Sequence, residues 1–182
     1  MRAAFLDGSP GKPKESTTAW LLSHGDSLYL AVRAEKESLK HLVAKHTERD
    51  SDVWQDEALE LFIDPWSSRH DRYFHVAINA KGTLRDARER DDLTWNAAWE
   101  VATGRDGERA WILEARIPYA SLGLAQGQLN KIWSFNLTRS TRNPKKPGTN
   151  EDSAWSPTGT DSSHVPEMYG KLWLDVGNVE NR

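Results

Sequence analysis

The alternating run at residues 57–64 constrains the fold more than any other stretch of the chain. It reads Glu-Ala-Leu-Glu-Leu-Phe-Ile-Asp and is followed by Pro65, which cannot donate to a β-ladder and therefore ends a strand. Successive side chains of a strand point to opposite faces of the sheet. One face carries Leu59, Leu61 and Ile63. Glu60 lies on the other face, as either a solvated carboxylate or a polar group that binds a ligand.

Similar runs recur along the chain and are separated by short turns. The further predicted strands are 17–24, 27–34, 72–79, 83–88, 99–103, 110–118, 131–139 and 169–175. Two pairs among them have short glycine-containing connectors and are typical of hairpins: 17–24 with 27–34, and 99–103 with 110–118. Residues 35–46 leave a helix, an irregular segment and a short strand open. Many short strands without a βαβ rhythm predict an all-β, antiparallel β-sandwich of the immunoglobulin-like kind, with little helix.

The length of 182 residues suits a single domain with a substantial core. Residues 1–16 include a breaker-rich stretch and are predicted to be a lead-in segment, so that 17–182 form the sandwich. Residues 141–161 are rich in Pro, Gly, Asn and Ser and are predicted to be a long loop, which carries Trp155.

Composition excludes several classes of partner and cofactor. The chain has no cysteine, so disulfides, thiolate metal sites and iron–sulfur clusters are ruled out. Its net charge of -3 argues against nucleic-acid binding, and the lack of a long apolar run argues against a membrane span or a signal peptide. We expect an extracellular protein whose targeting segment is absent from this sequence.

Trp54 is the first candidate binding residue. It lies in the polar segment 52–56, six residues before Glu60, where a large ring has no obvious strand to pack on. The chain contains nine tryptophans, more than a core of this size requires. An indole in a loop next to a strand that carries a carboxylate indicates a binding site.

Several ordered pieces together resemble the family 9 carbohydrate-binding modules and their relatives among the DOMON-like sandwiches. The pieces are residues 28–32, 53–64, 78–82, 112–118, 133–136, 155–157 and 169–172. The resemblance covers roughly residues 17–174, and the stretch from Trp54 to Asp64 is its most specific part.

The resemblance implies a noncatalytic module that binds a sugar unit, often at a chain end, between two aromatic side chains. Trp54 and Trp155 match the two walls, Glu60 matches the sugar-binding carboxylate, and His75 takes a neighbouring polar position. A pyranose offers an apolar face to an indole and hydroxyls at its edge. We expect the two indoles to face each other roughly 7–8 Å apart, since each sugar face needs contacts of about 3.5–4.0 Å.

Two further polar residues complete the predicted site. Asn79 lies four positions beyond His75, and therefore on the same strand face, and Asp152 lies close before Trp155. Each has an equally good alternative interpretation, Asn79 as a turn cap and Asp152 as a solvated loop residue. The expected partner is a polysaccharide or oligosaccharide, and the module is expected to target a covalently linked polysaccharide-degrading domain.

Two alternative functions remain open at this stage. A glycoside hydrolase would need two carboxylates, such as Glu60 with Glu57, Asp56 or Asp152, although nothing in the sequence indicates the raised pKa of a general acid. Related sandwiches carry haem, for which Met168 is the one candidate methionine ligand besides Met1.

No cofactor is required for sugar binding, but the resemblance allows a structural calcium ion. The acidic loops that could supply oxygen ligands contain Asp50, Asp52, Asp91 and Asp92. No calcium-loop motif is present, and the metal site is left unassigned.

Overall fold

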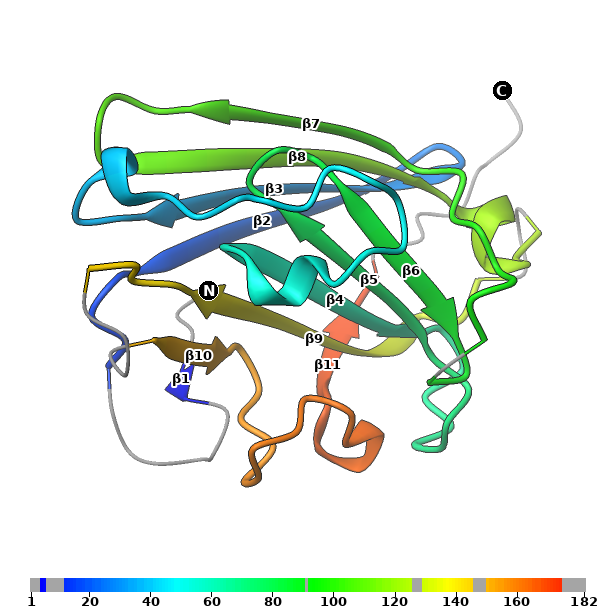
Figure 1. Cartoon of the computed structure of the whole chain (residues 1–182). Coiled ribbons are helices and arrows are strands. Elements are labelled where there is room, and N and C mark those ends of the chain that lie inside the picture. Colours follow the sequence, from blue (N-terminus) through cyan, green and yellow to red (C-terminus); the bar gives the residue numbers. More distant parts are fainter. Residues whose placement is uncertain (1–3, 6–11, 91, 126–128, 146–149, 175–182) are drawn as a thin grey trace.

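The protein is a sandwich of two antiparallel β-sheets (Figure 1). The computed structural model describes residues 4–5, 12–90, 92–125, 129–145 and 150–174. Helix within these ranges is confined to four short 3-10 helices: η1 (Leu39–His41), η2 (Val53–Gln55), η3 (Tyr119–Leu122) and η4 (Pro166–Met168). No helix in the described part of the chain is long and apolar enough to cross a membrane. The prediction of an all-β, antiparallel sandwich is confirmed.

The larger sheet has seven strands. Its order is β1 (Ala4–Phe5), β10 (Glu151–Ala154), β9 (Ile132–Thr141), β4 (Ala58–Asp64), β5 (Phe74–Asn79) and β6 (Leu84–Arg88), with β11 (Gly170–Trp173) also paired to β9. The strand β4 predicted from the alternating run lies at the centre, between β5 and β9. Glu60 therefore sits in the middle of the sheet.

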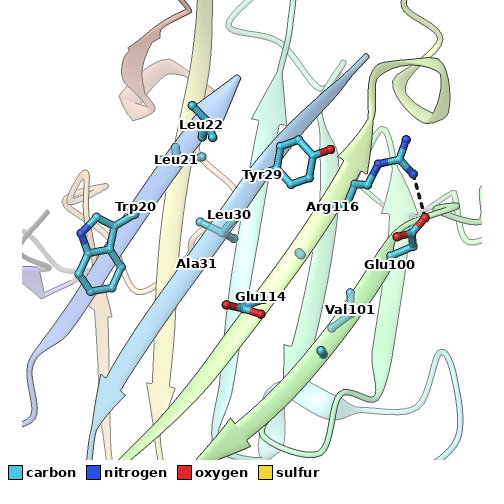
Figure 2. A pocket seen from close by; sticks show the side chains of 12 residues that line it. Trp20, Leu21, Leu22, Tyr29, Leu30, Ala31, Glu100, Val101, Glu114 and Arg116 are labelled. Atoms are coloured by element: carbon cyan, nitrogen blue, oxygen red, sulfur yellow. Dashed lines mark hydrogen bonds and ion pairs between the residues drawn. The ribbon is translucent and has the colours of Figure 1, made fainter. Parts of the chain in front are cut away.

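The smaller sheet has four strands, in the order β2 (Thr17–His24), β3 (Ser27–Glu35), β8 (Ala110–Pro118) and β7 (Glu100–Arg105). Both predicted hairpins form, β2 with β3 and β7 with β8, and β3 pairs with β8 to join them. Side chains on the outward-facing surface of this sheet are seen in Figure 2.

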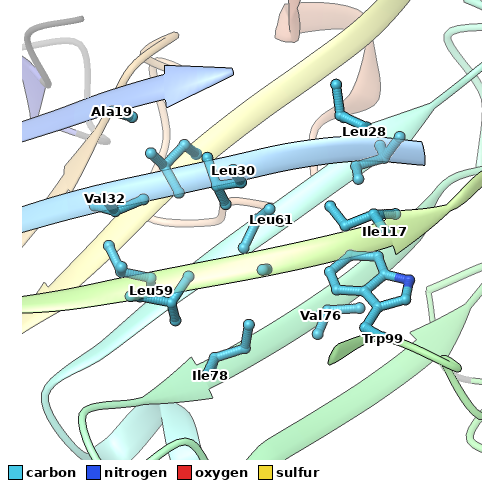
Figure 3. Close-up of a cluster of buried hydrophobic side chains, with 14 of the residues drawn as sticks. Ala19, Leu28, Leu30, Val32, Leu59, Leu61, Val76, Ile78, Trp99 and Ile117 are labelled. Carbon is cyan, nitrogen blue, oxygen red and sulfur yellow. The ribbon is translucent and has the colours of Figure 1, made fainter. Parts of the chain in front are cut away.

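The hydrophobic core fills the space between the two sheets (Figure 3). As predicted, β4 contributes Leu59, Leu61 and Ile63, and β9 contributes Trp133, Phe135 and Leu137. The four-stranded sheet faces them with Leu28, Leu30, Val32, Trp111, Leu113 and Ile117. Burying one such side chain contributes about 1.5–3 kcal/mol, so the alternation on these strands accounts for the pairing of the two layers.

A buried ion network ties the two sheets together at one end. The carboxylate of Glu57 is fully buried and contacts Arg139 at 2.7 Å and Lys36 at 2.8 Å. Arg139 also donates hydrogen bonds to the carbonyl of Ser16 and to the hydroxyl of Thr17, which belong to the segment leading into the other sheet. Removing one partner of such a network leaves a buried charge unpaired, which is strongly destabilising.

Two short strands lie in segments that the sequence predicted to be irregular. Strand β10 falls inside the predicted loop 141–161, and β1 falls inside the predicted lead-in 1–16. Neither shows an apolar alternation, because β10 extends β9 along its outer edge and β1 in turn pairs with β10. Their backbone hydrogen bonds come from a distant neighbour, which local propensity does not encode. In the undecided stretch 35–46, Glu35 ends β3 and Leu39–His41 form the short helix η1.

Candidate functional site

A cleft of about 640 Å³ lies on the outer face of the seven-stranded sheet. Its volume is within the range of roughly 300–1,000 Å³ that ligand pockets occupy. The lining residues are Trp54, Glu60, His75, Arg85, Ala87, Arg90, Ser140, Arg142, Asp152, Asp161, Ser162, Ser163 and His164. Four of the six predicted site residues are thus brought together.

Glu60 and His75 form the floor of the cleft. The Nε2 of His75 lies 2.8 Å from the Oε2 of Glu60, and the two side chains are only 7% and 12% exposed. The His75 imidazole stacks in parallel on the Phe62 ring, with 4.4 Å between ring centroids. Stacking holds the His75 ring, and the hydrogen bond to that ring holds the Glu60 carboxylate. The remaining lone pairs of the carboxylate can therefore accept hydrogen bonds from a ligand in a defined direction.

The pKa of Glu60 lies below its ordinary value. Burial alone would raise the pKa, but the hydrogen bond and charge of His75, with smaller contributions from His164 and Arg142, outweigh burial and lower it. Glu60 is therefore ionised at neutral pH and acts as a hydrogen-bond acceptor. A general acid of a glycosidase needs a raised pKa, which is the opposite direction.

Trp54 lies at the rim of the cleft on η2 and is partly exposed. The guanidinium of Arg85 lies over its indole, 4.5 Å from the ring centroid, and Arg142 donates a 2.8 Å hydrogen bond to its carbonyl oxygen. A cation over an indole face holds the ring in place without burying it. The loop position predicted for Trp54 is therefore a short, anchored helical turn.

Arg142 connects several parts of the site. Besides its bond to Trp54, it forms a 2.7 Å ion pair with Asp152, and its backbone N–H donates to the buried Glu57. Asp152 pairs in register with Ser140, which lines the same cleft. The predicted placement of Asp152 near the pocket thus agrees with the cleft lining, although its carboxylate already has a cationic partner.

His164 closes the cleft from a distant segment that sequence reasoning did not select. Its Nδ1 lies 2.7 Å from the Tyr73 hydroxyl, and its ring packs edge-on against His75 with 4.8 Å between centroids. Arg90 donates a hydrogen bond to the His164 carbonyl oxygen. Arg85, Arg90, Arg142 and His164 were all missed because each stands in a polar stretch that reads as solvated surface.

Trp155 does not face Trp54 across the cleft, contrary to the prediction. It follows β10 directly, so its side chain points to the sheet face opposite to that of Ala154 and Asp152. The indole packs on Phe135 of the core, 5.8 Å between ring centroids, and a Cβ added to Gly170 would lie 2.6 Å from it. Because Gly170 has no side chain, the Trp155 ring can pack directly against its backbone.

Asn79 is a structural residue rather than a lining residue of the cleft. It is fully buried, donates hydrogen bonds to Asp56 at 2.9 Å and to the carbonyl of His46 at 2.8 Å, and accepts from the N–H groups of Lys81 and Thr83. These bonds hold the β5–β6 turn and an adjoining loop. The turn-capping interpretation of Asn79 is the one that the structure supports.

The remaining predicted ligands are four loop aspartates, considered for calcium, and Met168, considered for haem. Within the described ranges, no group of three or more His, Asp or Glu side chains is arranged to hold a metal ion. Asp50 and Asp52 lie in the described loops, Asp92 caps the N–H of Thr94, and Asp91 lies outside the described residues. Met168 is 48% exposed and is not among the residues that line the cleft.

The fold and the cleft together define a β-sandwich binding module. Residues 3–176 match the family described as carbohydrate family 9 binding domain-like. Because the match covers nearly all of the 182 residues, the chain belongs to this family and is a noncatalytic carbohydrate-binding module.

Solved structures with the same fold include three carbohydrate-binding proteins. A family 9 module from Caldicellulosiruptor kristjanssonii in complex with glucose is 14% identical, with a TM-score of 0.69 over 99% of this chain and 86% of that one. A family 9 module from the same organism in complex with cellotriose is 12% identical, with a TM-score of 0.66 over 90% of this chain and 77% of that one. A Bacteroides uniformis protein named as carbohydrate-binding is 19% identical, with a TM-score of 0.70 over 95% of this chain and 84% of that one. At these identities the likeness shows the fold alone. No curated protein matches the chain.

Proposed function

We propose that the cleft on the outer face of the seven-stranded sheet binds one sugar unit, with Trp54 as the stacking surface and Glu60 as the principal hydrogen-bond acceptor. The observation that carries the proposal is the ionised, oriented carboxylate of Glu60 beside a partly exposed indole. A sugar presents an apolar face to the indole and hydroxyl donors to the carboxylate. Hydrogen bonds to a charged group contribute about 1.5–3 kcal/mol each.

The other lining groups match the edge of a sugar ring. Arg142 and Arg85 offer N–H donors to ring or hydroxyl oxygens, and each is already held in position, by Asp152 and by the Trp54 ring respectively. Side chains that are fixed before binding lose little entropy on binding. The single stacking residue, Trp54, replaces the two-walled arrangement that the sequence predicted.

The segment with Ser162, Ser163 and His164 lines the cleft beside the floor formed by Glu60 and His75. We propose a terminal sugar unit as the ligand, because the resemblance to family 9 modules implies binding at chain ends. The likeness to modules bound to glucose and to cellotriose supports glucose and short cello-oligosaccharides as the first ligands to test.

The wider role is proposed from the family. We infer that the module directs a covalently linked polysaccharide-degrading domain to its substrate outside the cell, and that binding needs neither a cofactor nor calcium. Dialysis against a chelator should leave the affinity for glucose unchanged, and a loss that added calcium restores would show that an ion is required.

The main test is a glycan array followed by isothermal titration calorimetry with glucose and cellotriose. Trp54→Ala should abolish measurable binding without lowering the melting temperature, because a rim indole contributes little to the core. The matched control is Trp173→Ala, which removes an indole that is 72% exposed on β11. Equal loss of binding in both variants, or a strong destabilisation by Trp54→Ala alone, would contradict the proposal.

Glu60→Gln should weaken binding by about 1–3 kcal/mol through loss of charge-assisted hydrogen bonds. Glu108→Gln, at an exposed position in the β7–β8 turn, is the control for removing a carboxylate elsewhere. An unchanged affinity for the Glu60 variant would leave Glu60 with a structural role only.

A further inference from the structure

The outer face of the four-stranded sheet carries a second groove of about 540 Å³, on the opposite side of the sandwich from the Glu60 cleft. Three of its side chains are large, apolar and well exposed: Trp20 (55%), Leu22 (62%) and Tyr29 (37%). Exposed apolar side chains that gather in one patch of a folded surface mark an interaction site. The proposed sugar cleft does not use any of them.

The strand register explains the shape of the groove. One row across the sheet runs through Leu22, Tyr29, Arg116 and Glu100, and the next runs through Trp20, Ala31, Glu114 and Ala102. The first row is a ridge of large side chains, whereas the second is low at Ala31 and Ala102, with Trp20 at its β2 end and Glu114 between the two alanines. Four strands at about 4.8 Å spacing make this trough about 14 Å long, which is room for more than one sugar ring.

Aromatic rings and a carboxylate stand together along this trough. Figure 2 shows the Trp20 ring on β2, the Tyr29 ring on β3 and the Glu114 carboxylate on β8. Within the described part of the chain, Glu114 has no hydrogen bond or ion pair, whereas Arg116 beside it is paired with Glu100 at 2.8 Å. Glu114 thus offers a free acceptor next to two stacking surfaces.

These features favour a glycan over a protein partner. The centre of a protein interface is depleted of charged residues, and burying an unpaired carboxylate there is costly. A sugar chain supplies hydroxyl donors for Glu114 and apolar ring faces for Trp20 and Tyr29 while leaving the carboxylate hydrated. The trough is also open along its length, so a chain can lie across the strands without ending there.

We propose that this face, defined by Trp20, Tyr29 and Glu114, is a second carbohydrate-binding surface that holds an internal segment of a neutral polysaccharide. The chain would then contact polysaccharide on both sides of the sandwich. Two sites that engage one polymer raise the overall avidity well above the affinity of either. The proposal rests on a different face from the Glu60 cleft and stands or falls independently of it.

The test uses native gels that contain hydroxyethylcellulose, glucomannan or xylan, with the double variant Trp54→Ala/Glu60→Gln as the background so that the first cleft is silent. This background should still be retarded in at least one gel. Adding Trp20→Ala should raise the dissociation constant roughly tenfold, the value of one aromatic stacking contact, and Glu114→Gln should raise it in the same gel. Adding Trp173→Ala, which removes a still more exposed indole (72% against 55%) on the other sheet, should change nothing.

Three outcomes would overturn the proposal. The first is that the background variant runs unretarded in all three gels, and the second is that Trp20→Ala leaves the retardation unchanged. The third is that sedimentation velocity shows a dimer that Trp20→Ala dissociates, in which case the face is occupied by a second copy of the chain. Melting curves of each variant check that folding is intact, which the exposure of Trp20 leads us to expect.

Discussion

The two outer faces of the sandwich present the same local sequence pattern in different surroundings. Glu60 on β4 stands between Leu59 and Leu61, and Glu114 on β8 stands between Leu113 and Ala115. Both carboxylates point away from the core. Glu60 is 12% exposed and bonded to His75, whereas Glu114 is exposed and unpaired within the described residues.

The difference comes from what lies over each face. The segment around His164 and the short helix with Trp54 cover part of the seven-stranded sheet, so that Glu60 loses water and gains fixed partners. No described segment is placed over the trough beside Glu114. A covered carboxylate with a set orientation suits selective recognition of one sugar unit, while an open one suits a polymer that slides or binds in several registers.

Trp155→Ala should have the largest effect, because the indole belongs to the core and not to the cleft. We expect a loss of about 2–4 kcal/mol in the free energy of unfolding, the range for truncating a large core side chain that is partly exposed. Denaturant unfolding measures it. Unchanged stability together with lost sugar binding would instead restore Trp155 as a wall of the cleft.

Glu60→Gln and Glu114→Gln compare the two faces directly. The first should lower the free energy of unfolding by about 1–3 kcal/mol, because it removes the charge that pairs with the buried His75. The second should change it by less than about 0.5 kcal/mol, as for most surface substitutions. Equal effects in chemical denaturation would show that covering the face has no energetic consequence for its carboxylate.

Acidification should remove the stability that the ionised Glu60 carboxylate contributes. Because the pKa of Glu60 is lower in the folded protein than its usual value of 4.5, its contribution to stability is complete above about pH 4.5. The contribution is lost as the pH falls below that value and through the folded pKa. Melting temperatures measured from pH 7 to pH 3 should therefore fall less steeply for Glu60→Gln than for the wild type.

Trp20→Ala should have the smallest effect on stability, within about 0.5 kcal/mol, since more than half of the side chain is exposed. Thermal unfolding beside the wild type measures it. A destabilisation comparable to that of Trp155→Ala would mean that Trp20 packs on the protein and offers no free ring to a ligand.

The sequence by itself determined the class of fold and the inward faces of the strands. Alternation with period two is a local property, so residues 57–64 and 131–139 were enough to place Leu59, Leu61 and Ile63 of the first run, and Trp133, Phe135 and Leu137 of the second, in the core. The same local reasoning identified Trp54 and Glu60 as unusual, because neither fitted an apolar pattern. It also left Asn79 and Asp152 undecided.

Only the tertiary structure decided which residues line the cleft and which hydrogen bonds hold them there. Tyr73 and His164 are 91 positions apart, Trp54 and Arg142 are 88 apart, and nothing local relates them. The side on which Trp155 lies depends on the register of β10 against β9, and a shift of one residue would turn the indole to the other face. Register and loop cover arise from hydrogen bonds and packing between distant segments, so they are fixed only when the whole sandwich has formed.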